Sequence, residues 1–315
     1  MEFLRLLEGV RTPFFDTFFS TVTHLGEETL FLAIAIFVFW CIGKREGYYL
    51  LCVGFVGTVV NQFLKLSFKI PRPFDLDPTF SAVESAIPEA QGYSFPSGHT
   101  QNIAGTFGAI AVFSRKVWCI VLSVIIILTV AFSRMYLGVH TPLDVSVSLG
   151  IAAMLVFAFA PLFTEKRFDK CMPYVVGACL ILGIAFAVYV HTLDPAGFVA
   201  KNYTSGLNNS ASILGCLFGL AVVYPLDRFC IKFDTRAAWY AQIFKLVLGL
   251  ALVLAIKEGL KIPLGLIPSA FAARSVRYFL VVLFGGAVYP LTFKLWTRIK
   301  IPALDKFTEK MLRKN

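Results

Sequence analysis

Charged residues are scarce in this chain of 315 residues. Asp, Glu, Lys and Arg make up 15% of it, against about a quarter in a typical soluble domain, and 57% is hydrophobic. The shortage excludes an ordinary water-soluble protein and predicts an all-α fold, a polytopic transmembrane helix bundle. The net charge of +10 fits cationic loops on one membrane side better than a nucleic-acid partner, so no nucleic acid is expected.

Cysteine motifs and a signal peptide are also missing. The seven cysteines show no CxxC or Cys/His spacing, which argues against a zinc site or a disulfide framework. Met1 to Gly26 lacks the compact apolar core of a cleavable signal. Its Phe and Leu residues alternate with Arg5, Glu8, Arg11 and Asp16, so we expect an interfacial helix that lies along the membrane.

Long apolar stretches dominate the rest of the chain. Nine of them are candidate spans: Glu27–Gly43, Tyr48–Leu64, Thr100–Phe113, Val117–Phe132, Leu143–Phe163, Met172–Val190, Ala211–Tyr224, Trp239–Ile256 and Val276–Phe293. Several are shorter than the roughly 20 residues that a bilayer core requires. We expect residues 1–170 to form one unit, with the interfacial helix and about five spans. Residues 171–315 add about four spans and a basic tail.

A first polar cluster lies where the second apolar stretch ends. Lys65 and Arg72 are seven residues apart, or two helical turns, so both are expected on one helix face. Pro71 and Pro73 should stop the helix there. A compact ammonium and a guanidinium fork together match the oxygens of a phosphate. Taken alone, the two cations fit interfacial anchors at a helix end better than a phosphate site.

A second cluster precedes the stretch that begins at Thr100. Free N–H groups and the positive dipole end of a helix there form an anion site. Ser97 can donate a hydrogen bond, Gly98 allows close backbone approach, and His99 can protonate a leaving oxygen. The alternative is a plain helix cap with an incidental histidine.

The third cluster carries the most information. Thr141 is expected as an N-cap, with Pro142 at the first helical position and Asp144 at the third. His140 and Asp144 then lie about one turn apart. The carboxylate can bind one ring nitrogen and leave the other free as a nucleophile. Arg134 adds a third cation. A capping role for Asp144, with His140 as a loop residue, is the alternative.

All three clusters fall at helix ends, and helix parity puts them on one side of the membrane. That side carries 11 Lys and Arg residues, three of them in the clusters, and the opposite side carries 17. The positive-inside rule predicts a multi-pass plasma-membrane protein with an extracytoplasmic site and a cytoplasmic C-terminus.

Together the clusters match a three-part signature: Lys-x6-Arg-Pro, Pro-Ser-Gly-His and Ser-Arg-x5-His-x3-Asp. The chain resembles the type-2 phosphatidic acid phosphatase superfamily, integral-membrane lipid phosphatases related to vanadium-dependent haloperoxidases. The match covers Met1 to about Phe163. The resemblance implies catalysis by His140, which forms a phosphohistidine, by His99 as general acid, and by Asp144, which orients His140. It gives phosphate binding to Lys65, Arg72, Ser97, Gly98 and Arg134.

The resemblance also implies a lipid phosphate or pyrophosphate substrate in the bilayer, and no metal or cofactor. Undecaprenyl pyrophosphate and phosphatidylglycerophosphate are the suggested substrates, the first slightly favoured because the site faces outward. A phosphotransferase that passes the phosphoryl group to another lipid would use the same residues. A non-enzymatic lipid transporter would place function in the C-terminal spans and predicts a degraded catalytic set. The oligomeric state is open.

Overall fold

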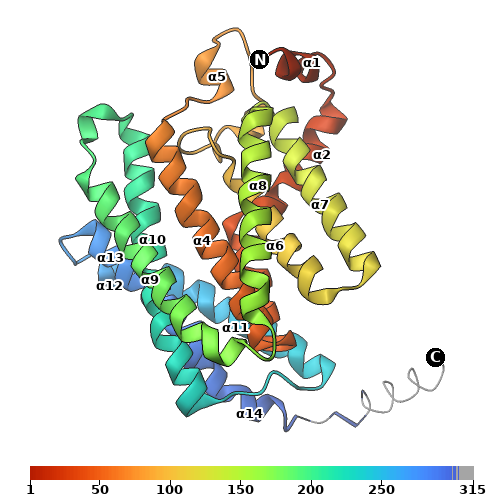
Figure 1. Ribbon diagram of the computed structural model, residues 1–315, viewed down its shortest axis with the longest axis vertical. Helices are drawn as coiled ribbons and strands as arrows, with labels where there is room; N and C mark the ends of the chain where they lie inside the picture. Colours follow the sequence, from red (N-terminus) through yellow and green to blue (C-terminus); the bar gives the residue numbers. More distant parts are fainter. Residues whose placement is uncertain (300, 303, 305–315) are drawn as a thin grey trace.

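The chain folds as a bundle of long, roughly parallel and antiparallel helices (Figure 1). The computed structural model describes residues 1–299, 301, 302 and 304, and across these it contains helices and no β-strand. The all-α prediction is therefore confirmed. The long helices are α4 (Lys44–Phe68), α6 (Gly98–Ser114), α7 (Val117–Tyr136), α8 (Pro142–Phe159), α9 (Phe168–Thr192), α10 (Ala200–Pro225), α11 (Trp239–Gly259) and α13 (Ala270–Leu283).

Shorter elements link the long helices or extend them. The N-terminal ones are α1 (Glu2–Gly9), α2 (Pro13–Thr23), η1 (His24–Gly26), α3 (Glu28–Phe37) and the π-turn η2 (Val38–Ile42). Those that follow are α5 (Pro73–Leu76), η3 (Glu84–Ala86), η4 (Ala160–Phe163), η5 (Pro195–Gly197), η6 (Leu226–Ile231), α12 (Lys261–Leu264), η7 (Phe284–Val288), η8 (Tyr289–Thr292) and α14 (Phe293–Trp296).

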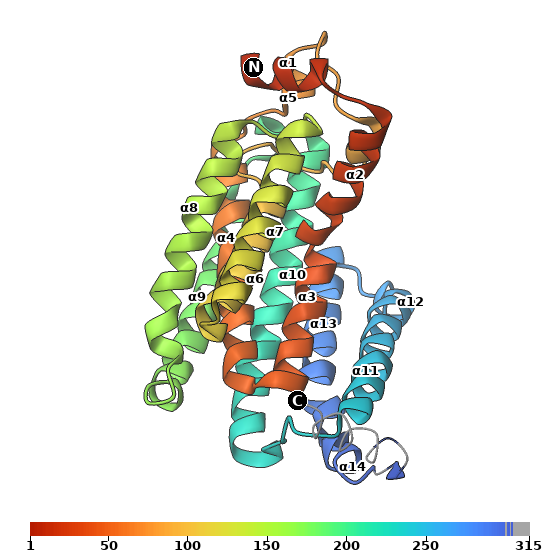
Figure 2. The ribbon, with the colours of Figure 1, turned by 90° about the vertical axis from the view of Figure 1, so that its right-hand side faces the viewer.

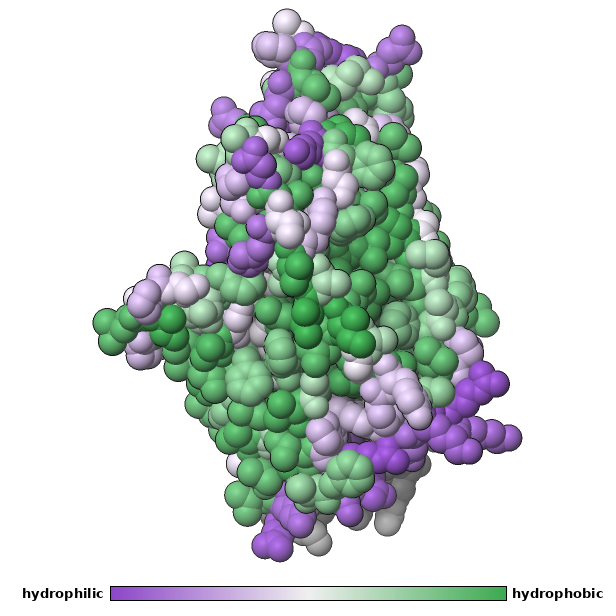
Figure 3. Space-filling model, turned by 60° about the vertical axis from the view of Figure 1, so that its left-hand side comes forward, coloured by the Kyte–Doolittle hydropathy of each residue, from purple (hydrophilic) through white to green (hydrophobic). Residues whose placement is uncertain are grey.

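The helices make this a multi-pass membrane protein, although the predicted number of spans needs correction. All nine predicted stretches are helical, but seven helices in the described part of the chain are long and apolar enough to cross a bilayer by themselves. An eighth span results if the bent pair of α2 and α3 counts as one. Helix α6 has only 17 residues, and it packs among α3, α4, α7 and α8. On the face that Figure 3 shows, apolar residues cover the middle of the molecule and polar residues gather toward its two ends.

The N-terminal segment differs from the expected single interfacial helix. It forms two helices, because Thr12 caps α2 and Pro13 begins it. Helix α1 lies across the outer end of the bundle, whereas α2 runs down its side (Figure 2). Helix α2 packs on α7, where Asp16 accepts a hydrogen bond of 2.8 Å from the Tyr136 hydroxyl. The chain bends by 52° between α2 with η1 and α3 with η2, so the segment is not one helix, and the interfacial placement of α1 stays a prediction.

The C-terminal helices dock closely on the others. Gly215 and Gly219 are spaced four residues apart on α10 and meet α13, the small-residue pattern that lets membrane helices approach. Helix α11 is joined through Lys245, a buried cation whose Nζ donates to the carbonyl of Trp40 at 2.9 Å. Part of the predicted basic tail lies outside the described residues, namely Lys300, Lys306, Lys310, Arg313 and Lys314.

Candidate active site

One cavity of about 390 Å³ opens at the end of the bundle where α4 finishes and α6 begins. Its walls come from η1, α3, α4, α6, α7, α10 and the loops after α4, α5 and α7. Six of the eight predicted site residues line it: Lys65, Arg72, Gly98, His99, Arg134 and His140. These six residues, up to 75 positions apart in the chain, therefore converge on one space. Ser97 and Asp144 lie behind its wall and are buried.

Arg72 reaches the cavity by a different route from the one predicted. Helix α4 ends at Phe68, and Lys69 adopts a left-handed backbone conformation with φ of 51°. Ile70 precedes Pro71, and a residue in that position is disfavoured in helical conformation. Arg72 therefore does not share a helix face with Lys65. It sits in the following loop, as the N-cap residue of α5.

Backbone carbonyls hold both cations in place. The Arg72 guanidinium donates from Nη1 to the Val139 carbonyl at 3.0 Å and from Nη2 to the Gln91 carbonyl at 2.9 Å. Lys65 Nζ donates to the Tyr93 carbonyl at 2.5 Å. Arg134 is fully buried, and its Nη1 donates to the Thr23 hydroxyl at 2.6 Å. Three buried positive charges thus line the cavity, whose wall also carries the carboxylates of Glu27, Glu28 and Glu89.

Ser97 has the geometry of a helix cap. Its hydroxyl accepts hydrogen bonds from the backbone N–H of Thr100 at 3.4 Å and from the Thr100 hydroxyl at 3.0 Å. The capping alternative is therefore realised, and the predicted contact between the Ser97 hydroxyl and a phosphate stays a prediction. Gly98, the first residue of α6, faces the cavity and brings the free N–H end of that helix to its wall.

His140 and Asp144 take up the arrangement expected from their spacing. Thr141 and Asp144 form a complete capping box at the start of α8. One oxygen of Asp144 lies 3.5 Å from Nδ1 of His140 and accepts a 2.6 Å hydrogen bond from the Ser94 hydroxyl. Ser94 Oγ is also 3.4 Å from that Nδ1, so it supports the pair. Sequence reasoning missed Ser94, since nothing in its motif marks it.

The other ring nitrogen of His140 faces Arg72. Nε2 lies 3.3 Å from Arg72 Nη1. A guanidinium has no acceptor, so Nε2 must accept and the proton of the neutral ring sits on Nδ1. Burial, followed by the positive charges of Arg72, Arg134 and Lys65, holds the pKa of His140 well below its usual range. The ring is therefore neutral at pH 7, and its Nε2 lone pair faces Arg72 at the wall of the cavity.

His99 also lines the cavity, beside a group that sequence reasoning missed. Its Nε2 lies 3.8 Å from Glu89 Oε2, and Glu89 also lines the cavity. Neither atom has a hydrogen-bond partner among the described residues. Gly26 makes this packing possible, because a Cβ there would lie 2.9 Å from the His99 Cβ.

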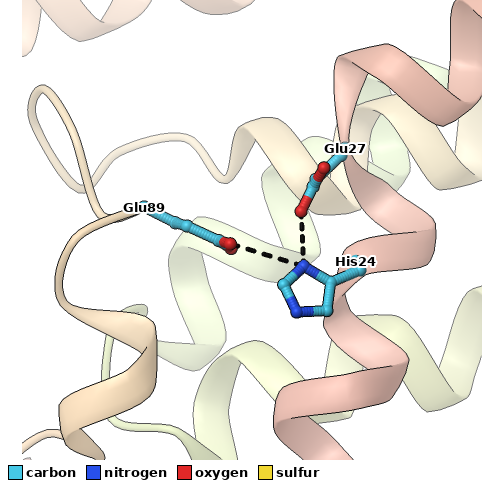
Figure 4. Close-up of side chains that lie close together, drawn as sticks. All are labelled: His24, Glu27 and Glu89. Atoms are coloured by element: carbon cyan, nitrogen blue, oxygen red, sulfur yellow. Dashed lines mark hydrogen bonds and ion pairs between the residues drawn. The ribbon is translucent and has the colours of Figure 1, made fainter.

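Glu89 also belongs to a group that we call the outer cluster: His24, Glu27 and Glu89 (Figure 4). His24 hydrogen-bonds Glu27 and lies 3.3 Å from Glu89. The three side chains could together offer ligands to a metal ion, since their ligand atoms lie within 4.8 Å of one another. His24 is exposed, and exposed groups of this kind are common without a metal.

Comparison with known proteins identifies the family. The PAP2 superfamily domain matches residues 45–168, and the transmembrane extension of PAP2 superfamily phosphatases matches residues 211–299. Phosphatidylglycerophosphatase B of Bacillus subtilis (strain 168) is 30% identical over 173 residues, which cover 50% of this chain and 79% of the relative. The chain belongs to the PAP2 superfamily. The resemblance to type-2 phosphatidic acid phosphatases is thus confirmed.

Two other relatives of this PAP2 chain are named for different activities. Undecaprenyl-diphosphatase BcrC of Bacillus subtilis (strain 168) is 33% identical over 132 residues, covering 40% of this chain and 65% of the relative. A probable sphingosine-1-phosphate phosphatase of Dictyostelium discoideum is 28% identical over 233 residues, which cover 68% of this chain and 55% of the relative. The PAP2 chain thus spans slightly under two thirds of the first relative and about half of the second. No solved structure matches it.

Proposed function

We propose that this protein is a lipid phosphatase that hydrolyses a phosphomonoester or pyrophosphate headgroup through a phosphohistidine on His140. One observation carries the proposal. His140 lines a cavity together with three buried cations and a second histidine, and its Nε2, which faces Arg72 of that cavity wall, keeps the lone pair that a nucleophile needs. Membership in the PAP2 superfamily supports the same conclusion.

The chemistry proceeds in two displacements. Nε2 of His140 attacks phosphorus, so that an N–P bond forms and the bond to the leaving oxygen breaks. His99 gives its proton to that oxygen. A water molecule then attacks the phosphohistidine, His99 accepts a proton from it, the N–P bond breaks and phosphate leaves. Asp144 stabilises the positive charge that the ring acquires when it is phosphorylated.

Phosphoryl transfer depends mainly on positioning and on charge stabilisation. Lys65, Arg72 and Arg134 supply positive charge from three directions, and the α6 N-terminus at Gly98 supplies N–H donors. We propose that these groups take the role that metal ions have in other phosphatases, so that the reaction needs neither metal nor cofactor.

Several lipid headgroups would suit such a cavity. The relatives have undecaprenyl diphosphate, phosphatidylglycerophosphate and sphingosine 1-phosphate in their names, and each combines a phosphate with a lipid tail. We propose that the substrate belongs to this class. The excess of Lys and Arg on the opposite side supports a plasma-membrane location, with the site extracytoplasmic and the C-terminus cytoplasmic. Residues 1–170 remain proposed as the catalytic unit.

The test is phosphate release from these three lipids in detergent by wild type and His140→Ala. We expect release by wild type and a loss of at least about a thousandfold in the variant, since the nucleophile is gone. Mass spectrometry of His99→Asn incubated with substrate should find a phosphoryl group on His140. Equal release by wild type and His140→Ala would overturn the proposal. Product that forms only when an acceptor lipid is added would identify a phosphotransferase.

A further inference from the structure

A second cavity lies deeper in the bundle and is almost entirely apolar. It has a volume of about 180 Å³ and lies between α3, α4, α10, α11 and α13 with its extension η7. Its walls are built mainly from aliphatic and aromatic side chains, among them Leu32, Phe55, Leu220, Val253 and Val282. A cavity of about 150 Å³ lined by such residues binds benzene, so this pocket has room for roughly six to eight carbon atoms.

The two cavities share three helices, and on each the lining changes from polar to apolar within one or two turns. On α3, Glu28 lines the candidate active site and the next turn, at Leu32, lines the apolar pocket. On α4 the change falls between Thr58 and Phe55. Residues three or four apart share a helix face, so one continuous face of each helix serves both cavities.

Helix α10 repeats the pattern. Ser205 and Asn209 line the candidate active site, and Cys216 and Leu220 line the apolar pocket. Successive residues of this set are four or seven positions apart along the helix, so they again share one face. The same three helices thus carry the polar candidate active site at one level and the apolar pocket at another. This order matches a lipid phosphate, which has a polar headgroup followed by an apolar tail.

We propose that the apolar pocket binds the far end of the single long hydrocarbon chain of the lipid whose phosphate reacts at His140. This rests on the proposed function, which it extends by assigning a tail-binding site. The other two walls come from α11 and α13, in the region that matches the PAP2 transmembrane extension. The C-terminal helices then complete a substrate site together with the catalytic unit, to which they are joined through α10 (Figure 2).

The dimensions fit a long chain. The pocket residues Phe55 and Tyr48 lie 10 and 17 residues before Lys65 on α4, which places them about 15 and 26 Å along the helix axis. An extended chain advances about 1.2 Å per bond, from the backbone dimensions of a polypeptide. By the same dimensions, an eight-carbon chain spans roughly 10 Å and stops short of the pocket, whereas an 18-carbon chain spans roughly 21 Å and enters it.

The experiment compares octyl phosphate and octadecyl phosphate in mixed detergent micelles. Ala33→Phe places a ring in the pocket, and Leu254→Trp does so from α11; both positions line it. Ala251→Phe is the matched control, because Ala251 is exposed on α11 and outside the pocket. We expect wild type to favour octadecyl phosphate in kcat/KM by at least about tenfold, which corresponds to the burial of roughly two methylene groups.

Ala33→Phe and Leu254→Trp should each lower kcat/KM for octadecyl phosphate about tenfold and leave octyl phosphate within about twofold. Ala251→Phe should change neither. Equal losses on both substrates, or no loss on either, would overturn the tail site. Because octyl phosphate reports hydrolysis without the pocket, a failure of the proposed function would appear separately, as release that is unaffected by His140→Ala.

A binding measurement is independent of turnover. Octadecyl phosphate with a photoreactive diazirine at its last carbon is irradiated with the His140→Ala protein, and the labelled residues are mapped by mass spectrometry. Label on pocket residues such as Leu220 or Val253 supports the assignment. Label confined to bilayer-facing residues of α7, such as Ile125, refutes it.

Discussion

Replacement of Asp144 by Asn tests the proposed chemistry most directly. The substitution keeps the shape of the side chain and an oxygen that can accept the 2.8 Å hydrogen bond from the Thr141 N–H. It removes a negative charge that lies 3.5 Å from Nδ1 of His140. The fold should therefore survive, while the stabilisation of a positively charged phosphohistidine is lost.

The distance sets the size of the effect. Two unit charges at this separation interact by about 5 kcal/mol at an effective dielectric constant of 20, and by about 1 kcal/mol in water. These limits correspond to rate losses of about 3000-fold and about tenfold. Because the pair is buried, we expect kcat to fall by about 10² to 10³. KM should change little, since Asp144 does not line the cavity.

The assay is steady-state hydrolysis of octyl phosphate at pH 7, with thermal unfolding in detergent measured on the same samples. Asp16→Asn is the matched control, an identical change on α2 outside the cavity, and should leave kcat within about twofold. Ser94→Ala removes the hydroxyl that supports the pair, and about a tenfold loss is expected from one hydrogen bond to a charged group. A kcat for Asp144→Asn within threefold of wild type, with normal unfolding, would refute the assigned role.

Three further predictions concern pH, metal ions and packing. The lowered pKa of His140 keeps its ring neutral as pH falls, so the acid limb of the kcat/KM profile should lie below the usual His value of about 6.5. Arg72→Gln removes one cause of the lowered pKa and should move that limb to higher pH. A limb that does not move would contradict the assignment. Dialysis against EDTA should leave hydrolysis unchanged, whereas a loss that Mg²⁺ restores would point to the outer cluster. Gly215→Ala should lower the thermal midpoint, because its Cβ would lie 2.2 Å from the Ser275 carbonyl oxygen, an overpacking that costs about 1–3 kcal/mol. Gly177→Ala, with no atom within 4 Å of the added Cβ, should be neutral or stabilising by up to about 1 kcal/mol; equal midpoints for the two variants would show that the α10–α13 contact is not tight.

The sequence was sufficient for the parts of the site that local chemistry fixes. Thr141 and Asp144 form the predicted capping box, with Pro142 at the first helical position, because the side-chain and backbone partners there are three residues apart. The convergence of His99 and His140 could be inferred because helix ends alternate between the two sides of a membrane. Both deductions need only spacing and parity.

Features that depend on tertiary structure could not be obtained in this way. Ser94 and Glu89 reach the site from the loop between α5 and α6, which has no helical periodicity to fix where a side chain points. The place of Arg72 depends on a left-handed residue at Lys69, a conformation that non-glycine residues seldom adopt. The apolar pocket is invisible in sequence, because its residues look like any other membrane-facing side chains.

The carbonyl oxygens that hold Lys65 and Arg72 have a consequence for the end of the catalytic cycle. These cations are fixed by the loop backbone before any ligand arrives, so little side-chain freedom is lost when a phosphate enters. The same fixed cations would bind orthophosphate as well as they bind an esterified headgroup. Departure of the inorganic product, rather than bond cleavage, is then a natural candidate for the slow step, and accumulated orthophosphate should compete with the lipid.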